Sequence, residues 1–204
     1  YEIASCLVGS EMCIRDRLAP VLVWMHGGAL KNGSANEFDG SVLAEQQQVV
    51  VVTLNFRLGV FGFVDFSRFG SEYAGSASNG IRDAILALQW IQDNIEEYSG
   101  DPSNVTISGE SSGGTMVLSL LGCPSANSLY QKAIACSPTC AYRDLEDPTK
   151  KIRLALNINT DDYLTPMLTM SPVDICKLEL GFGPHVDGEV IKELSLIHIS
   201  EPTR

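Results

Sequence analysis

Residues 104–121 read Asn-Val-Thr-Ile-Ser-Gly-Glu-Ser-Ser-Gly-Gly-Thr-Met-Val-Leu-Ser-Leu-Leu. The first five form a short run rich in β-branched side chains, which predicts a buried strand. The apolar run over 115–121 predicts a helix, and between the two lies a Gly-x-Ser-x-Gly motif centred on Ser111. The sequence therefore predicts a strand that turns sharply into a helix, with a serine at the turn.

The segments around this unit extend it into an α/β fold. Further strands are predicted over 21–25, 49–54 and 132–137, and the first two are apolar enough to be covered on both faces. Apolar residues at helical spacing predict a helix over 81–95, and shorter helices are expected over 41–48 and from 152 onward. Residues 165–172 are predicted to form a loop. Together these elements predict one α/β domain, a mostly parallel sheet with helices on both faces.

Composition and charge exclude several classes of protein. The 204 residues are 45% apolar and 19% charged, which is typical of a soluble globular domain with one core. Lys and Arg number 14 against 25 Asp and Glu, and the net charge of −11 argues against a nucleic-acid partner. No apolar run reaches the roughly 20 residues of a membrane span. A cytoplasmic and a secreted location both remain open, as does the oligomeric state.

The two ends of the chain read as foreign to this domain. Residues 194–204 can be written in codons that resemble a transposase-based sequencing-library adapter, and the reverse complement of that DNA encodes residues 6–16. One piece of DNA would explain both ends; the alternative is that real terminal segments match it by chance. We therefore expect residues 1–17 and 194–204 to be adapter-derived and 18–193 to be a partial domain.

The serine at the predicted turn is suited to nucleophilic catalysis. Such a turn holds the serine in a strained conformation, and small residues such as Gly109 and Gly113 avoid a collision on either side of it. The N-H groups and the positive end of the following helix point at the reacting centre. We therefore predict Ser111 as the nucleophile.

Ester cleavage also needs donors for the oxygen that becomes negative. The glycine-rich turn His26-Gly27-Gly28-Ala29, which follows the first predicted strand, supplies candidates. Backbone N-H groups of Gly28 and Ala29 would donate together with the N-H of Ser112. An ordinary loop after a strand is the competing interpretation of this turn taken alone.

Several segments together resemble the type-B carboxylesterase family, which includes the cholinesterases and bacterial para-nitrobenzyl-type esterases. They are residues 20–29, 49–63, 80–95, 100–114 and 183–189. The resemblance implies a partial α/β-hydrolase fold, a Ser-Glu-His triad, a small-molecule carboxylic ester as substrate, and neither cofactor nor metal. It places Ser111 at the nucleophile position and Gly28, Ala29 and Ser112 at the oxyanion-hole positions.

The chain departs from the family's pattern in four respects. Ala29 stands where many members have a third glycine, Ser112 stands where alanine is usual, and residues 78–80 only approximate an Asn-x-Gly turn. The family's triad acid and histidine also lie beyond the segment that resembles 183–189. Because a serine is a poor nucleophile without a base, we expect this chain by itself to be nearly inactive.

Other polar residues have competing interpretations. Gly27 and Glu110 are candidates for the substrate pocket, although Glu110 is equally compatible with a buried structural carboxylate. His26 precedes Ser111 in the chain and is interpreted as structural. His185 follows Ser111, but in a Pro-x-Val-Asp-Gly context where the family's base does not occur.

The cysteines do not have the spacing of a zinc site. Buried free thiols are favoured over a disulfide for the four outside the foreign ends, which are Cys123, Cys136, Cys140 and Cys176. Cys6, Cys13 and His198 fall in the ends and carry no functional weight.

The sequence thus predicts a serine-dependent carboxylic-ester hydrolase that works through an acyl-enzyme. The alternative is a non-catalytic adhesion or binding protein on the same fold, because a fold alone does not determine function.

Overall fold

Four parallel strands form the central sheet, in the order β2-β1-β3-β4. They are β1 (Ala19–Met25), β2 (Val50–Leu54), β3 (Gly100–Glu110) and β4 (Lys132–Cys136). In the centre of the sheet Val23 pairs with Val52 on one side and with Ile107 on the other. Because the strands are parallel, the carboxyl ends of β1 and β3 lie next to each other, and Met25 pairs with Gly109 there.

This computed structural model describes residues 18–139, 148–178, 180, 182–184 and 186–192. The predicted adapter-derived segments, His185 and Cys140 lie outside the described residues. The boundaries predicted for the foreign ends therefore stay predictions.

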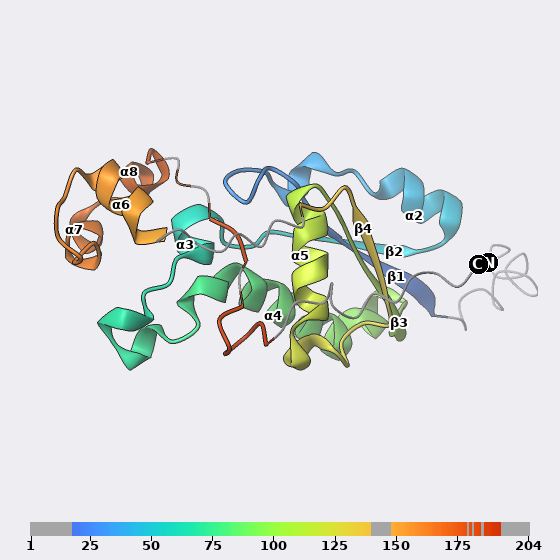
Figure 1. Ribbon diagram of the computed structural model, residues 1–204. Helices are drawn as coiled ribbons and strands as arrows, with labels where there is room; N and C mark the ends of the chain where they lie inside the picture. The colour runs from blue at the N-terminus through green and yellow to red at the C-terminus, as the bar shows by residue number, and fades with distance from the viewer. Residues whose placement is uncertain (1–17, 140–147, 179, 181, 185, 193–204) are drawn as a thin grey trace, which may run out of the picture.

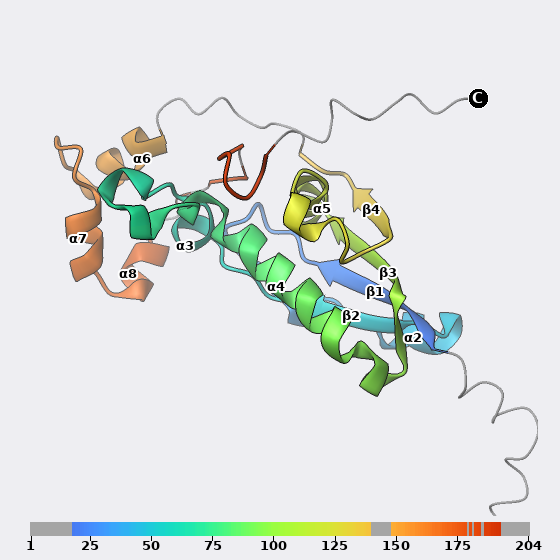
Figure 2. The same ribbon diagram turned by 90° about the horizontal axis from the view of Figure 1, so that it is seen from below.

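Helices cover both faces of the sheet. In Figures 1 and 2, α4 (Asn79–Asn94) and α5 (Ser112–Leu121) lie on one side and α2 (Ser41–Gln47) lies on the other. The remaining helices are α3 (Gly59–Phe63), α6 (Pro148–Leu156), α7 (Leu164–Thr169) and α8 (Pro172–Cys176). Six short 3-10 turns complete the described elements: Ala35–Glu37, Ser67–Phe69, Ser71–Tyr73, Ser76–Ser78, Ile95–Tyr98 and Pro124–Ala126.

The core lies between β1, β3 and the two helices that cover them. Val23 and Ile107 of the sheet, Ile81 and Ile91 of α4 and Met116 of α5 are all fully buried. Removing these side chains from water supplies the main driving force that holds the helices against the sheet. The apolar spacing that predicted the helix over 81–95 thus marks the buried face of α4.

The predicted α/β class, parallel sheet and helices on both faces are confirmed. The prediction that β2 is covered on both faces is wrong: four of its five residues are only partly buried, because β2 lies at an edge of the sheet among the described residues. In the described part of the chain, no helix is long and apolar enough to cross a membrane.

The prediction of a loop over 165–172 is wrong, because this region contains α7 and the start of α8. Met167 anchors α7 by burial, with 5% of its surface exposed. Ser171 caps α8, where its Oγ accepts a hydrogen bond from Asp174 N-H at 3.2 Å, and Pro172 occupies the first helical position. A single buried side chain in each helix, with a serine cap in α8, therefore determines these short helices rather than an apolar stripe.

Candidate active site

Ser111 lies at the sharp turn between β3 and α5. Its φ of 55° and ψ of −120° are unusual for a residue other than glycine. Ser111 N-H donates to Cys136 O at 2.8 Å, and Ser111 O accepts from Thr115 N-H at 3.1 Å. The end of β4 and the first turn of α5 therefore hold the strained backbone of Ser111 from both sides.

The two glycines that flank Ser111 leave room for the end of β1. A Cβ atom on Gly109 would lie 2.5 Å from Gly113 C and 2.9 Å from Met25 O. A Cβ on Gly113 would lie 2.8 Å from His26 O and closer still to Met25 O. Any side chain at either position would push the turn away from β1.

The loop after β1 has three successive residues with positive φ. These are Gly28 at 106°, Ala29 at 55° and Leu30 at 59°. Gly28 O accepts hydrogen bonds from the N-H groups of Lys31 and Asn32 at 3.0 and 3.2 Å, and Leu30 O accepts from Gly59 N-H at 2.7 Å. These bonds stabilise a backbone conformation that alanine and leucine rarely adopt.

The loop lies directly against the Ser111 turn. Leu30 N-H donates to Ser112 Oγ at 3.2 Å, and a Cβ on Gly27 would lie 3.4 Å from Ser111 Cβ. Within the described ranges, the N-H groups of Gly28, Ala29 and Ser112 donate to no protein acceptor. The structure thus brings together Ser111 and the three residues predicted as oxyanion donors, with their N-H groups available to a ligand.

Glu110 and Gly27, the candidates for the substrate pocket, are neighbours beside Ser111. Glu110 Oε2 lies 3.0 Å from the position that a Cβ on Gly27 would occupy. The Glu110 side chain is exposed, so the interpretation as a buried structural carboxylate is wrong. A negative charge next to Ser111 would favour polar or cationic groups on a ligand.

His26 is buried beneath the loop. Its Nδ1 donates to Gly27 O at 2.7 Å, and its ring stacks on Phe56 with a centroid distance of 4.6 Å. These contacts are those of a structural residue, as the sequence predicted. Among the described residues, Ser111 Oγ has no hydrogen-bond partner. None of these residues is therefore in place to act as the base that takes its proton.

The three described cysteines are free thiols, but the prediction that they are buried holds only for Cys123. Cys136 is exposed because it ends β4, at the edge of the described sheet, and Cys176 is exposed at the end of α8. Burial raises the pKa of the Cys123 thiol to about 12, and the charge of Asp187 acts in the same direction. Cys123 is therefore an unreactive core residue.

Sequence reasoning missed the contact between Ser78 and Asp187. Ser78 Oγ donates to Asp187 Oδ2 at 2.6 Å across 109 positions of sequence. Asp187 lies in a segment that carries the family resemblance and Ser78 lies just before another, but nothing in the sequence pairs them.

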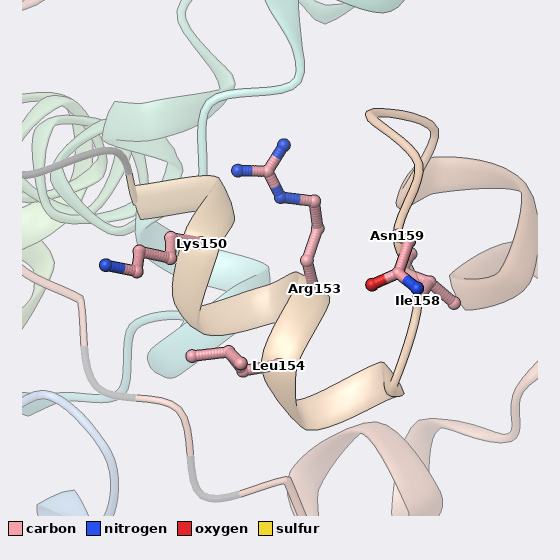
Figure 3. A pocket seen from close by; sticks show the side chains of 5 residues that line it. All are labelled: Lys150, Arg153, Leu154, Ile158 and Asn159. Atoms are coloured by element: carbon pink, nitrogen blue, oxygen red, sulfur yellow. The ribbon is translucent and has the colours of Figure 1, made fainter.

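A separate shallow hollow of about 270 Å³ lies on α6 and the residues that follow it. Figure 3 shows its lining side chains, with Lys150, Arg153 and Leu154 on the helix and Ile158 and Asn159 beyond it. In both views of the fold α6 is well separated from α5 (Figures 1 and 2), so the hollow does not belong to the Ser111 site.

Known proteins match most of this chain. A sequence profile of the carboxylesterase family matches residues 11–157. The para-nitrobenzyl esterase of Bacillus subtilis is 42% identical over 192 residues, covering 85% of this chain and 39% of that protein. Neuroligin-2 of Mus musculus is 35% identical over 189 residues, covering 85% of this chain and 22% of that protein.

Solved structures of esterases also match most of this chain. A carboxylesterase of Geobacillus stearothermophilus aligns with a TM-score of 0.77 and 32% identity over 89% of this chain and 40% of that one. A thermophilic PNB esterase aligns with a TM-score of 0.76 and 37% identity over 87% of this chain and 40% of that one. The chain spans about two fifths of the length of these esterases. The fold is the predicted partial α/β-hydrolase fold, and the chain belongs to the carboxylesterase family.

Proposed function

We propose that the protein to which this chain belongs is a serine-dependent carboxylic-ester hydrolase. The observation that carries the proposal is the position of Ser111 in a strained turn beside three N-H groups that donate to no acceptor in the part of the chain that the structure describes. A nucleophile next to a preorganised group of donors is the arrangement that acyl transfer requires. Family membership and the esterases among the relatives support the same reaction.

In the proposed mechanism Ser111 Oγ attacks the carbonyl carbon of a small-molecule ester. The carbonyl oxygen becomes negative, and the N-H groups of Gly28, Ala29 and Ser112 stabilise it. The alcohol leaves with the proton that Ser111 gave up, and an acyl-enzyme remains. Water then attacks the acyl group, which releases the carboxylic acid and restores the Ser111 hydroxyl.

The proton of Ser111 has to pass through a base. We propose that this base is a histidine oriented by a glutamate, and that both residues lie in the part of the related esterases that this chain does not span. The chain by itself then hydrolyses esters at a small fraction of the rate of the full-length protein, because only the oxyanion donors and substrate binding remain.

The proposal is tested with a short-chain nitrophenyl ester and a fluorophosphonate probe. The full-length protein should hydrolyse the ester and react with the probe, and Ser111→Ala should abolish both. The chain as given should react with the probe far more slowly. Unchanged hydrolysis in the Ser111→Ala variant would refute the assignment of the nucleophile.

A second candidate function is binding without catalysis on the same fold. The similarity to neuroligin-2, whose name does not describe an esterase, favours it. A full-length protein that carries Ser111 and its donors yet shows no reaction with the probe would support binding over catalysis.

A further inference from the structure

Two residues beside Ser111 are connected through the loop after β1. Ala29 lies in this loop at a φ that favours glycine, and Ser112 is the first residue of α5. Leu30 connects them, because its N-H donates to Ser112 Oγ at 3.2 Å while its own backbone follows directly on Ala29. Leu30 and Ser112 are buried, with 4% and 6% of their surfaces exposed, so water does not readily replace this bond.

The hydrogen bond acts on the strained part of the loop. Ala29 and Leu30 have φ values of 55° and 59°, a region that glycine enters freely and that alanine and leucine disfavour. The Leu30 N-H belongs to the peptide group that follows Ala29, so fixing that N-H fixes the ψ angle of Ala29. The direction of the Ala29 N-H, one of the proposed oxyanion donors, depends on the same backbone.

We propose that the Ser112 hydroxyl is a positioning group for the oxyanion hole, which compensates for the alanine at position 29. The inference rests on the proposed function. Ser112 then contributes twice, since its backbone N-H faces the oxyanion and its Oγ holds the loop that carries the N-H groups of Gly28 and Ala29. Replacing the hydroxyl leaves the backbone donor of residue 112 in place and releases only the loop.

The experiment is a double-mutant cycle on the full-length protein. Ser112→Ala should lower kcat for a short-chain nitrophenyl ester about tenfold, because loosened donors stabilise the transition state less, with KM changed less than about twofold. Ala29→Gly relieves the unfavourable φ at position 29 while Leu30 keeps its own, so in that background the same Ser112→Ala change should cost less, a factor of about three. Equal losses in the two backgrounds, or no loss in the first, would overturn the proposal.

A matched control distinguishes the loss of the positioning bond to the loop from a general destabilisation of α5. Ser119 is another buried serine of α5, and its Oγ donates to Thr115 O at 2.8 Å within the helix. Ser119→Ala deletes a comparable hydroxyl without contact to the loop, so kcat should stay within about twofold of the parent value. If Ser119→Ala lowers kcat as much as Ser112→Ala does, the proposal is wrong.

Hydrogen exchange gives a readout that does not need catalysis. In the chain as given, Ser112→Ala should speed exchange of the Leu30 amide about tenfold or more, whereas Ser119→Ala should leave it unchanged. Unchanged exchange at Leu30 overturns the positioning role even if ester hydrolysis is confirmed. Conversely, a full-length protein without Ser111-dependent hydrolysis refutes the proposed function, and the Leu30 amide then decides whether Ser112 holds the loop.

Discussion

Ser78 Oγ donates to Asp187 Oδ2 at 2.6 Å, and this bond attaches the last described segment to the start of α4. The other carboxylate oxygen, Oδ1, accepts from the N-H groups of three residues that follow it, at 3.0, 2.8 and 3.0 Å. Lys192 N-H extends the attachment by donating to Gly122 O at the end of α5. A single carboxylate therefore organises residues 187–191 and connects them to the body of the fold.

Removing this carboxylate should destabilise the fold. We expect Asp187→Ala to lower the free energy of unfolding by about 2–3 kcal/mol, because four donors lose a charged acceptor at once. Urea unfolding followed by circular dichroism measures the change. The matched control is Asp162→Ala, which removes an exposed carboxylate that accepts a hydrogen bond from Thr165 N-H and should lower the free energy of unfolding much less than Asp187→Ala does. Similar losses in both variants would contradict this view of Asp187.

The contribution of Asp187 to the free energy of unfolding should also depend on pH. Burial alone would raise the pKa of its carboxyl, but the hydrogen bonds from Ser78 and from three backbone N-H groups outweigh burial and lower the pKa. A carboxyl whose pKa is lower in the folded state stabilises the fold above its unfolded pKa of about 3.9, and this stabilisation is lost as the pH falls through the folded pKa.

We therefore expect the difference in unfolding free energy between the parent chain and Asp187→Ala to be constant from about pH 5 to 7 and to shrink below about pH 4. Urea titrations of both proteins across this range measure the difference. A difference that is as large at pH 3 as at pH 7 would show that protonation of Asp187 does not release the segment.

The turn at Ser111 lies in close contact with the end of β1. A Cβ on Gly113 would collide with the carbonyl oxygens of Met25 and His26, which are backbone atoms that cannot rotate away. Gly113→Ala should therefore lower the free energy of unfolding by at least about 3 kcal/mol or prevent soluble expression. Gly183→Ala is the control, since its Cβ would meet nothing nearer than a Leu30 methyl at 4.0 Å. Gly113→Ala with parental stability would mean that β1 does not pass so close to the turn.

The sequence predicted the sheet and the sharp turn at Ser111 because both follow from local chemistry. Continuous β-branched runs indicate parallel strands. Gly109 and Gly113 indicate the turn, because a larger residue at either position would collide with the backbone. The helix over 81–95 was predicted because its apolar stripe covers four turns. For the same reason α7 and α8 were missed: each is too short to show an apolar stripe, and a single buried side chain, with a serine cap in α8, decides its formation.

The rest of the site depends on contacts that a sequence does not display. Leu30 has a positive φ without being glycine, and its hydrogen bonds to Ser112 and Gly59 help to hold that conformation. The bond between Ser78 and Asp187 joins residues 109 positions apart, which no periodicity can pair. The candidate nucleophile and donors could thus be named from motifs, whereas the groups that hold them in place could not.

The reactivity of the thiols reports on whether the segment around Asp187 stays attached to the body of the fold. Cys123 is fully buried and its pKa is raised to about 12, so at pH 8 only about one molecule in 10⁴ carries the reactive thiolate. Cys136 and Cys176 are exposed. We expect iodoacetamide to label both exposed thiols of the native chain, and Cys123 at least about 100-fold more slowly, as measured for each site by peptide mass spectrometry.

Two further samples make this labelling experiment decisive. In denaturant Cys123 should label as fast as Cys176, because burial and the neighbouring Asp187 charge are both lost. In the Asp187→Ala variant under native conditions, Cys123 should label faster than in the parent if release of residues 187–191 uncovers it. The loss of the Asp187 charge also favours the thiolate, and both effects act in the same direction. Labelling of Cys123 as fast as Cys176 in the native parent chain would contradict the packing between α5 and the last described segment.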